Sequence, residues 1–236
     1  MIRALYTAAS GMMVESRKMD LLAHNLGNVQ TPGFRSSGLV RREVPTGGTA
    51  TDVQTAQAEH FLDPSSGPLR TTGRPLDLAV DGEGFFAVET QGGVAYTRNG
   101  GFALRADGLL VDRSGNPVLG EAGPVRVPGP GEVQVGSDGT LRVEGRRVDR
   151  LRLETFQDAQ ALRPAGASLY YPVAGARAVP ADNGRVVQGA LEGSNLDGVA
   201  GMTRMVETLR AFEAYQKAIQ TVDEATSQAV RLGRVA

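Results

Sequence analysis

The C-terminal stretch from residue 194 to residue 234 constrains the fold most strongly. It contains no Pro, and its apolar residues recur at alternating steps of three and four. This spacing is typical of one face of a helix and is close to a heptad repeat. The apolar stripe consists of Met202, Met205, Leu209, Phe212 and Ile219. A helix of this length with such a stripe needs another element to cover it.

The other end of the chain predicts a second helix of the same kind, from about residue 2 to residue 28. The same spacing runs through Leu5, Ala8, Met12, Met19, Leu22, Leu26 and Val29, with Glu15 as the one interruption. Pro32 cannot continue a helix and disfavours helical geometry at Thr31, so we expect the helix to end there. Two helices therefore bracket the chain, and we expect them to pack on each other.

The segment between the helices has a different pattern. Residues 35–75 are rich in Thr, Ser, Gly and Pro without a sustained period, so we expect an irregular connector. From residue 76 the apolar residues alternate, and Asn99-Gly100, Asp107-Gly108 and Asp138-Gly139 separate the alternating runs. Such dipeptides are strong hairpin signals. Residues 76–193 are therefore expected to form an antiparallel β domain, closed into a barrel or a small sandwich.

The predicted fold class is α+β. A coiled-coil-like helical domain is expected from residues 1–34 together with 194–236, and the β domain lies between them in sequence. A chain of 236 residues is long enough to form one large domain or two small ones, each with its own core. Its net charge of −1 gives no overall attraction to nucleic acid. No apolar run approaches the roughly 18 residues of a membrane span, and no convincing cleaved signal peptide is present. We expect no membrane insertion, and export only by a route that retains the N-terminus.

No motif predicts catalysis, a cofactor or a metal ion. The chain lacks Cys, and its two histidines, His24 and His60, have no metal-ligand spacing. The glycines near residues 82–93 do not open a helix after a strand, so turns explain them better than a phosphate loop. Asp77, Asp81 and Glu83 suit the polar face and turn of a strand. We therefore expect a protein that is not an enzyme.

Two sets of polar residues each allow a structural and a functional interpretation. Arginines crowd residues 142–152, but acidic residues are interleaved with them and stacking aromatics are missing. A solvated strand face or an inter-subunit salt-bridge face is therefore favoured over a nucleic-acid site. Asn25 and Asn28 are expected to terminate the first helix by bonding its last carbonyls and the following turn, rather than to form a recognition element.

The apolar stripes of the helices predict assembly. Met13, Leu21 and Ala23 widen the first stripe, and Val206, Ala211, Ala218 and Val230 widen the second. A pair of helices can cover only one side of such stripes, so we expect other molecules to bury the rest. Heterologous packing of copies would produce a helical polymer.

Several motifs also resemble one family, in the family's order. They are ALYTAASGM and NLGNVQTPGF at the start, TGRPLDLAVDGEGFFAV, YTRNGGF and GNPVLG in the middle, and LEGSN and RAFEAYQKAIQTVDE at the end. They resemble the bacterial flagellar rod and hook proteins, most closely the basal-body rod proteins of the distal and proximal rod. Gly27, Gln30 and Pro32 depart from the usual turn, and residues 36–59 look shorter than in distal rod proteins, so both subtypes stay open.

The resemblance implies a structural subunit of the periplasmic rod, the axial drive shaft that transmits motor torque to the hook. It implies that the terminal helices form an inner coiled-coil tube and the β domain its outer layer. Implied partners are further copies, other rod and hook proteins, and the flagellar type III export apparatus, with an uncleaved N-terminal signal. The subunit-packing residues that it implies are Leu5, Met12, Asn25, Asn28, Phe34, Asn195, Leu209, Arg210, Phe212, Ile219 and Asp223.

Two other classes of protein remain as alternatives. A secreted adhesin or glycan-binding β module with helical oligomerisation ends would need an exposed aromatic cluster, whereas Tyr170 and Tyr171 are the only adjacent aromatic pair outside Phe85-Phe86. A peptidoglycan hydrolase would need a catalytic constellation, which the motifs do not provide.

Overall fold

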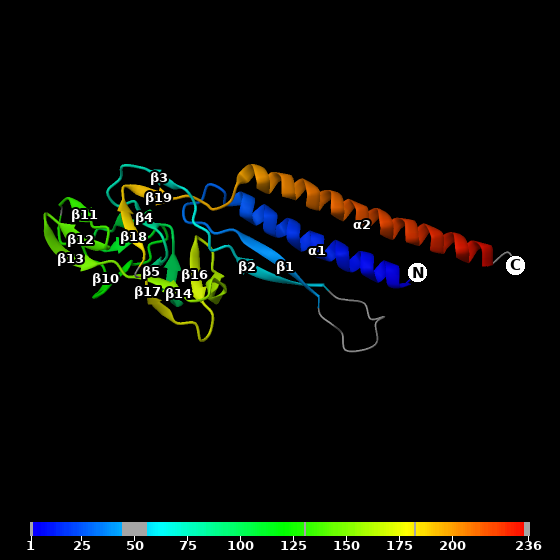
Figure 1. The fold of residues 1–236 in the computed structure, drawn as a ribbon, viewed down its shortest axis with the longest axis horizontal. Helices are drawn as coiled ribbons and strands as arrows, with labels where there is room; N and C mark the ends of the chain where they lie inside the picture. The colour runs from blue at the N-terminus through cyan, green and yellow to red at the C-terminus, as the bar shows by residue number, and fades with distance from the viewer. Residues whose placement is uncertain (1, 44–55, 130, 182, 234–236) are drawn as a thin grey trace. The chain divides into compact units, whose positions relative to one another are not determined.

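The computed structural model describes residues 2–43, 56–129, 131–181 and 183–233 (Figure 1). The chain divides into two compact units. We call Met1–Gly27, Ser37–Phe61 and Asp197–Ala236 the helical unit, and Asn28–Ser36 with Leu62–Leu196 the β unit. The two terminal helices and the central antiparallel β region predicted from the sequence are confirmed.

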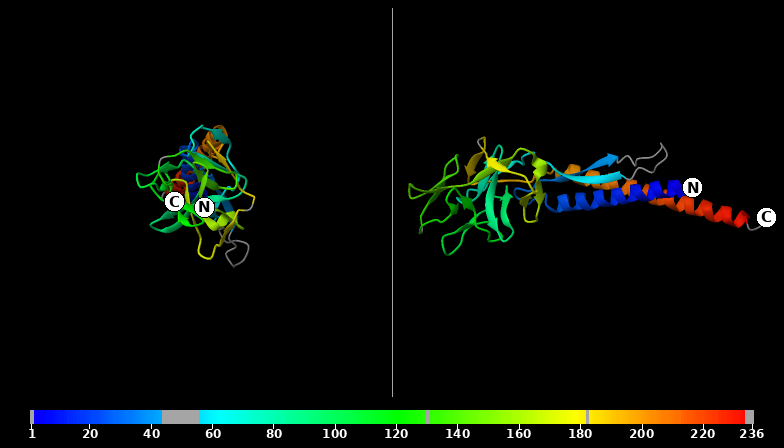
Figure 2. Two further views of the ribbon diagram at one scale, coloured as in Figure 1. Left: turned by 90° about the vertical axis from the view of Figure 1, so that its left-hand side faces the viewer. Right: turned by 90° about the horizontal axis from the view of Figure 1, so that it is seen from below.

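The helical unit is built around α1 (Ile2–Gly27) and α2 (Gly198–Gly233), which lie side by side (Figures 1 and 2). Gly11 of α1 lies directly against the ring of Tyr215, because a Cβ added at Gly11 would be 2.6 Å from Tyr215 Cε1. The missing side chain therefore allows the two helices to approach at this point.

Both helix ends form close to the predicted residues. At the start of α2, Asp197 Oδ1 accepts hydrogen bonds from the backbone N–H groups of Val199 (2.9 Å) and Ala200 (3.2 Å), which makes Asp197 the N-cap. After α1, Thr31 N donates to Asn28 O, and Thr31 Oγ1 donates to Asn28 Oδ1. Asn28 thus shapes the turn as expected.

Asn25 has a different role from the predicted bonding of its own helix carbonyls. Its Nδ2 donates to Ser37 O (2.7 Å), and its Oδ1 accepts from Ser37 N (3.1 Å). Asn25 therefore joins α1 to the first residue of β1 (Ser37–Glu43), a contact that local sequence reasoning cannot foresee.

The expected irregular connector contains three strands. β1 pairs with β2 (Ala56–Leu62), and β3 (Leu69–Thr71) pairs with β19 (Ala190–Glu192). Residues 44–55 of the expected connector lie outside the described residues. All three residues of β3 are exposed, so no alternation of buried and exposed positions reveals β3 in the sequence. Its partner, β19, lies far along the chain.

The β unit is antiparallel in every strand pair described. Its remaining strands are β4 (Leu78–Asp81), β5 (Phe85–Thr90), β6 (Gly93–Thr97), β7 (Ala103–Leu104), β8 (Leu110–Val111), β9 (Leu119–Gly120), β10 (Gly123–Pro124), β11 (Val133–Val135), β12 (Thr140–Val143), β13 (Arg146–Arg150), β14 (Leu153–Phe156), β15 (Leu162–Pro164), β16 (Leu169–Pro172), β17 (Ala178–Pro180) and β18 (Arg185–Gln188). A 3₁₀-helix occupies Ala159–Ala161.

The largest sheet has six strands in the order β15-β16-β6-β5-β14-β17, and smaller sheets surround it. Its outer strands, β15 and β17, are not paired with each other in the described part of the chain, so hydrogen bonding does not close this sheet into a barrel, one of the two expected forms. The β12–β13 hairpin turns at Glu144-Gly145, where both residues have positive φ (49° and 77°). Two consecutive positive φ values are the geometry that a two-residue hairpin turn favours.

Strand β5 separates two groups of buried side chains. Phe86 and Val88 belong to the larger core, which also includes Phe102, Leu110 and Leu141. Ala87, on the opposite face, belongs to the smaller core with Tyr96, Leu119 and Tyr170. The ring of Phe86 meets that of Phe102 edge to face at 5.1 Å between centroids.

Replacing Phe86 with Ala tests this account of the core. Phe86→Ala removes a fully buried ring and leaves a cavity, so we expect it to lower the free energy of unfolding by about 3–5 kcal/mol. Leu104→Ala, at an exposed position, serves as the control and should change it by less than about 1 kcal/mol. Denaturant unfolding of both variants measures the difference, and an equal loss in the two would contradict the assigned core.

Candidate functional site

Three segments of the β unit meet. One follows α1, one follows β2 and one precedes α2. Backbone hydrogen bonds link them: Gly33 N donates to Glu192 O (2.8 Å), Asp63 N to Ser36 O (2.9 Å), and Asn195 N to Phe34 O (3.3 Å). We call residues 31–36, 62–68 and 189–196 the junction. The two parts of the chain next to the terminal helices are thus held together inside the β unit.

A buried group of charges joins the junction to Arg98, the residue after β6. Arg35 Nη2 is 2.9 Å from Glu192 Oε1, and Arg98 Nη1 is 3.1 Å from Glu192 Oε2. The side chains of Arg35 and Glu192 are each 1% exposed and that of Arg98 is 4% exposed. Gly67 N also donates to Glu192 Oε1 (2.9 Å). We call Arg35, Arg98 and Glu192 the charge cluster. Both oxygens of this buried carboxylate have partners, as buried charges require.

The two guanidinium groups depend strongly on this one carboxylate. Burial lowers the pKa of Arg98, and the nearby charge of Glu192 partly opposes that effect. Arg98 also donates to Val80 O (3.2 Å) and Gly82 O (2.8 Å), and it lies 5.1 Å above the ring of Phe85. The Nε and Nη1 atoms of Arg35 and the Nε atom of Arg98 are buried without a hydrogen-bond partner among the described residues. Without Glu192, both buried cations would lose the carboxylate that they contact directly.

Predicted packing residues also lie in the junction. Asn195 Oδ1 accepts from Ser36 N (2.7 Å), and its Nδ2 donates to the carbonyls of Asp63 (3.3 Å) and Ser65 (3.2 Å). Phe34 is buried. These side chains, like Asn25, are therefore engaged inside the chain itself.

Along α2 the buried face differs in register from the predicted stripe. Thr208 is buried, and Met205, Phe212, Tyr215 and Ile219 are half-buried. These five positions follow steps of three and four, and Tyr215 contacts α1 at Gly11. Met202 and Leu209, which the sequence assigned to the same stripe, are exposed. The predicted stripe is therefore wrong at these two positions, and the buried face of α2 includes Thr208 and Tyr215 in their place.

A second apolar stripe therefore lies on α2, on a side of the helix adjacent to the face that packs on α1. It consists of Val199, Met202, Val206 and Leu209, which are 76%, 58%, 50% and 44% exposed. We call it the exposed stripe. On α1, Leu5, Tyr6 and Met13 are also exposed, while Met12 is half-buried. Among the other predicted packing residues, Arg210 and Asp223 are exposed and Asn28 is half-buried.

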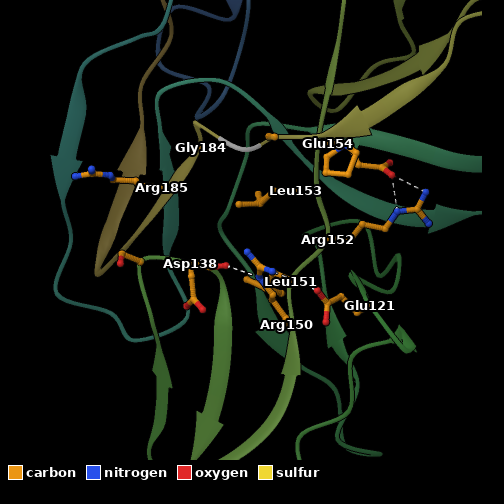
Figure 3. A pocket seen from close by; sticks show the side chains of 12 residues that line it. Glu121, Asp138, Arg150, Leu151, Arg152, Leu153, Glu154, Gly184 and Arg185 are labelled. Carbon is orange, nitrogen blue, oxygen red and sulfur yellow. Dashed lines mark hydrogen bonds and ion pairs between the residues drawn. The ribbon is translucent and has the colours of Figure 1, made fainter.

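The arginine-rich hairpin borders a pocket of about 550 Å³ (Figure 3). In it Arg150 lies 3.4 Å from Glu121, and Arg152 donates to Glu154 (2.8 Å), while Arg185 points away from them. Arg147 also pairs with Glu121 (3.4 Å). Glu121, from another segment, and Glu154, just after the hairpin, thus pair with three of its arginines, whose side chains are 41–61% exposed, in agreement with the interpretation as a solvated strand face.

Glu154 also holds the phenol of Tyr96, whose Oη donates to Glu154 Oε2 over 2.8 Å. Burial, and then the bond and charge of Glu154, raise the pKa of Tyr96 to about 12.

No nucleophile and base are paired in this pocket, and the described residues contain no group of His, Cys, Asp and Glu that could hold a metal ion. No helix in the described ranges is long and apolar enough to cross a membrane.

These features define a class of protein. It is a structural subunit with long terminal helices, an exposed apolar helix face and a β unit in which the segments next to the two helices are hydrogen-bonded to each other. Three family models match the chain. They are "Flagella basal body rod protein" at residues 5–35, "Flagellar hook protein FlgE/F/G D1 domain" at 79–143 and "Flagellar basal body rod FlgEFG protein C-terminal" at 187–232.

Curated relatives match over nearly the whole chain. The flagellar basal-body rod protein FlgF of Caulobacter vibrioides is 34% identical over 100% of both chains, and FlgF of Escherichia coli is 32% identical over 98% of both. The rod protein FlgG of Bacillus subtilis is 34% identical over 99% of this chain and 100% of its own. The chain belongs to the flagellar basal-body rod protein family. It is a structural subunit of the rod, and the adhesin and hydrolase alternatives gain no support.

The raised pKa of Tyr96 gives a test of its hydrogen bond to Glu154. Because this pKa lies above its ordinary value of 10.0, the neutral phenol stabilises the fold fully below pH 10, and that contribution is lost as pH rises through about 12. We expect a later stage of the rise in tyrosinate absorbance near pH 12. Tyr96→Phe should reduce this later stage. An unchanged later stage in Tyr96→Phe would contradict the assigned hydrogen bond.

Proposed function

We propose that this rod subunit polymerises through α1 and α2, and that the polymer is the axial drive shaft that transmits motor torque to the hook. The exposed stripe of α2 carries this proposal. Its apolar side chains are exposed while another face of α2 already packs on α1, so an additional partner is needed to remove them from water. Further copies of the chain and other rod or hook proteins are the proposed partners.

The paired helices are proposed to form a coiled-coil-like inner layer, with the β unit in the outer layer. Steps of three and four through Met205, Thr208, Phe212, Tyr215 and Ile219 support the coiled-coil spacing. On α1, half-buried Ala8, Met12, Glu15, Met19 and Leu22 follow the same steps. Each helix thus has the seam that a coiled coil requires.

The predicted packing residues divide into three groups under this proposal. Leu5, Leu209, Arg210 and Asp223 are exposed and available to neighbouring subunits, and Met12, Phe212 and Ile219 take part in the helix pair. Asn25, Asn28, Phe34 and Asn195 act indirectly, by fixing the chain around the helix ends. Function requires no cofactor and no enzymatic activity.

Delivery to the periplasmic rod is proposed to use the flagellar type III export apparatus, with an N-terminal signal that is not cleaved. The resemblance of residues 4–34 to the rod family and the lack of a small-residue cleavage site support this route. Mass spectrometry of the protein recovered from isolated basal bodies would test it, since loss of N-terminal residues would contradict the retained signal.

The exposed stripe can be tested by placing charges on it. Met202→Glu with Val206→Glu should keep the subunit monomeric at concentrations where the unmodified chain polymerises, because assembly would bury both carboxylates. Sedimentation velocity measures the change. The control is Glu207→Lys, which reverses the charge at the adjacent exposed position of the same helix and should leave assembly largely intact.

Hydrogen exchange of the β unit should be unchanged in the double variant, which separates a loss of assembly from a loss of folding. Normal polymerisation of Met202→Glu with Val206→Glu would contradict the role of the exposed stripe, whatever the family of the chain.

A further inference from the structure

The last part of the β unit, residues 185–196, has unusually many contacts with distant parts of the same unit. Its strand β18 pairs with β4, and its strand β19 pairs with β3. Val186 belongs to the larger core, and Leu191 is buried. We call residues 185–196 the strap.

Three polar side chains of the strap hold further segments. Gln188 Oε1 accepts from Val135 N (3.1 Å), while its Nε2 donates to Val133 O and Pro75 O (2.8 Å each). Asn195 bonds Ser36, Asp63 and Ser65, and Glu192 bonds Arg35, Arg98 and Gly67. The strap therefore contacts β3, β4, β11 and the segments that follow α1, β2 and β6.

Glu192 is the one strap residue whose absence leaves buried charge behind. Arg35 and Arg98 are buried in the β unit, and Glu192 is the carboxylate that both of them contact directly. Glu83, the other acid whose charge acts on Arg98, is exposed to water. Before the strap docks, both guanidiniums must therefore stay hydrated, and the surfaces around them cannot close.

Sequence separation indicates when the strap docks. Its bond from Ser36 to Asn195 spans 159 residues, that from Gly67 to Glu192 spans 125, and that from Arg98 to Glu192 spans 94. Strands β5 and β6, by contrast, pair through a turn at residues 91–92. Because closing a longer loop costs more conformational entropy, the hairpins can form first and the strap contacts last.

We infer that residues 185–196 act as a closing strap, with Glu192 as its lock: the β unit stays open until Glu192 enters between Arg35 and Arg98. The device makes the folding of the β unit depend on the residues just before α2 as well as on those just after α1. It acts within one chain and is independent of the assembly surface on α2.

The order of docking can be measured on the unmodified full chain. In pulse-labelling hydrogen exchange during refolding, amides of β5 and β6 should become protected before those of residues 185–196. Simultaneous protection of the two segments, or earlier protection of the strap, would overturn the inference. This measurement needs no variant.

Glu192→Gln tests the lock. If the strap docks late, the variant should unfold about tenfold faster or more, while its refolding rate changes by less than about twofold. Native-state exchange should then increase across β4, β5 and β6 as well as in the strap. An increase confined to residues 189–196, or refolding slowed as much as unfolding is accelerated, would show that Glu192 is not a lock for the whole unit.

Two further variants separate charge from shape. Glu83→Gln removes an exposed acid that also acts on Arg98, and it should leave both rates nearly unchanged. Arg35→Met combined with Glu192→Gln removes the guanidinium that has two unpartnered nitrogens, so it should recover much of the lost protection. If the double variant is as unstable as Glu192→Gln alone, uncompensated charge is not the reason, and the inference is wrong.

Discussion

The pairing of Glu192 with Arg35 and Arg98 is the constraint on which the β unit depends most. A buried carboxylate is stable only when its oxygens are bonded, and a buried guanidinium needs a counter-charge. In this chain the partners come from the segment after α1, the end of β6 and the last strand of the unit. One local requirement of electrostatics thus forces three distant segments into a single arrangement.

The helices show how far sequence periodicity reaches. The spacing of three and four found both helices and the half-buried seam of α1, because that seam is mostly apolar. On α2 the spacing also predicts a helix, but the predicted stripe combines buried and exposed residues from two sides of the helix. Thr208 and Tyr215 face inward and were not counted as apolar, while Met202 and Leu209 face outward. Two overlapping apolar stripes on one helix look like one wide stripe, and only the position of α1 separates them.

The junction and the connector strands could not be predicted for a different reason. Turn dipeptides and alternation found the central hairpins, whose partners are adjacent in sequence. Arg35 and Glu192 are separated by most of the chain, and a single charged residue in a short strand carries no periodic signal. Asn25 and Asn195 were recognised as notable residues, but their partners Ser37, Ser36 and Asp63 are fixed by tertiary structure alone.

A charge cluster is a costly way to hold strands together, since apolar side chains of similar size often stabilise a protein as well or better. The advantage of the charge cluster is that it fixes the register of β19 against β3. All three residues of β19 are buried, and Leu191 next to Glu192 could also fill an apolar site. A shift of β19 by one residue would place Leu191 or Gly193 against two guanidiniums and remove their carboxylate. An apolar core would tolerate that shift, whereas the charge cluster penalises it. We interpret the charges as the element that selects one alignment of β19 against β3, and with it one path for the chain into α2.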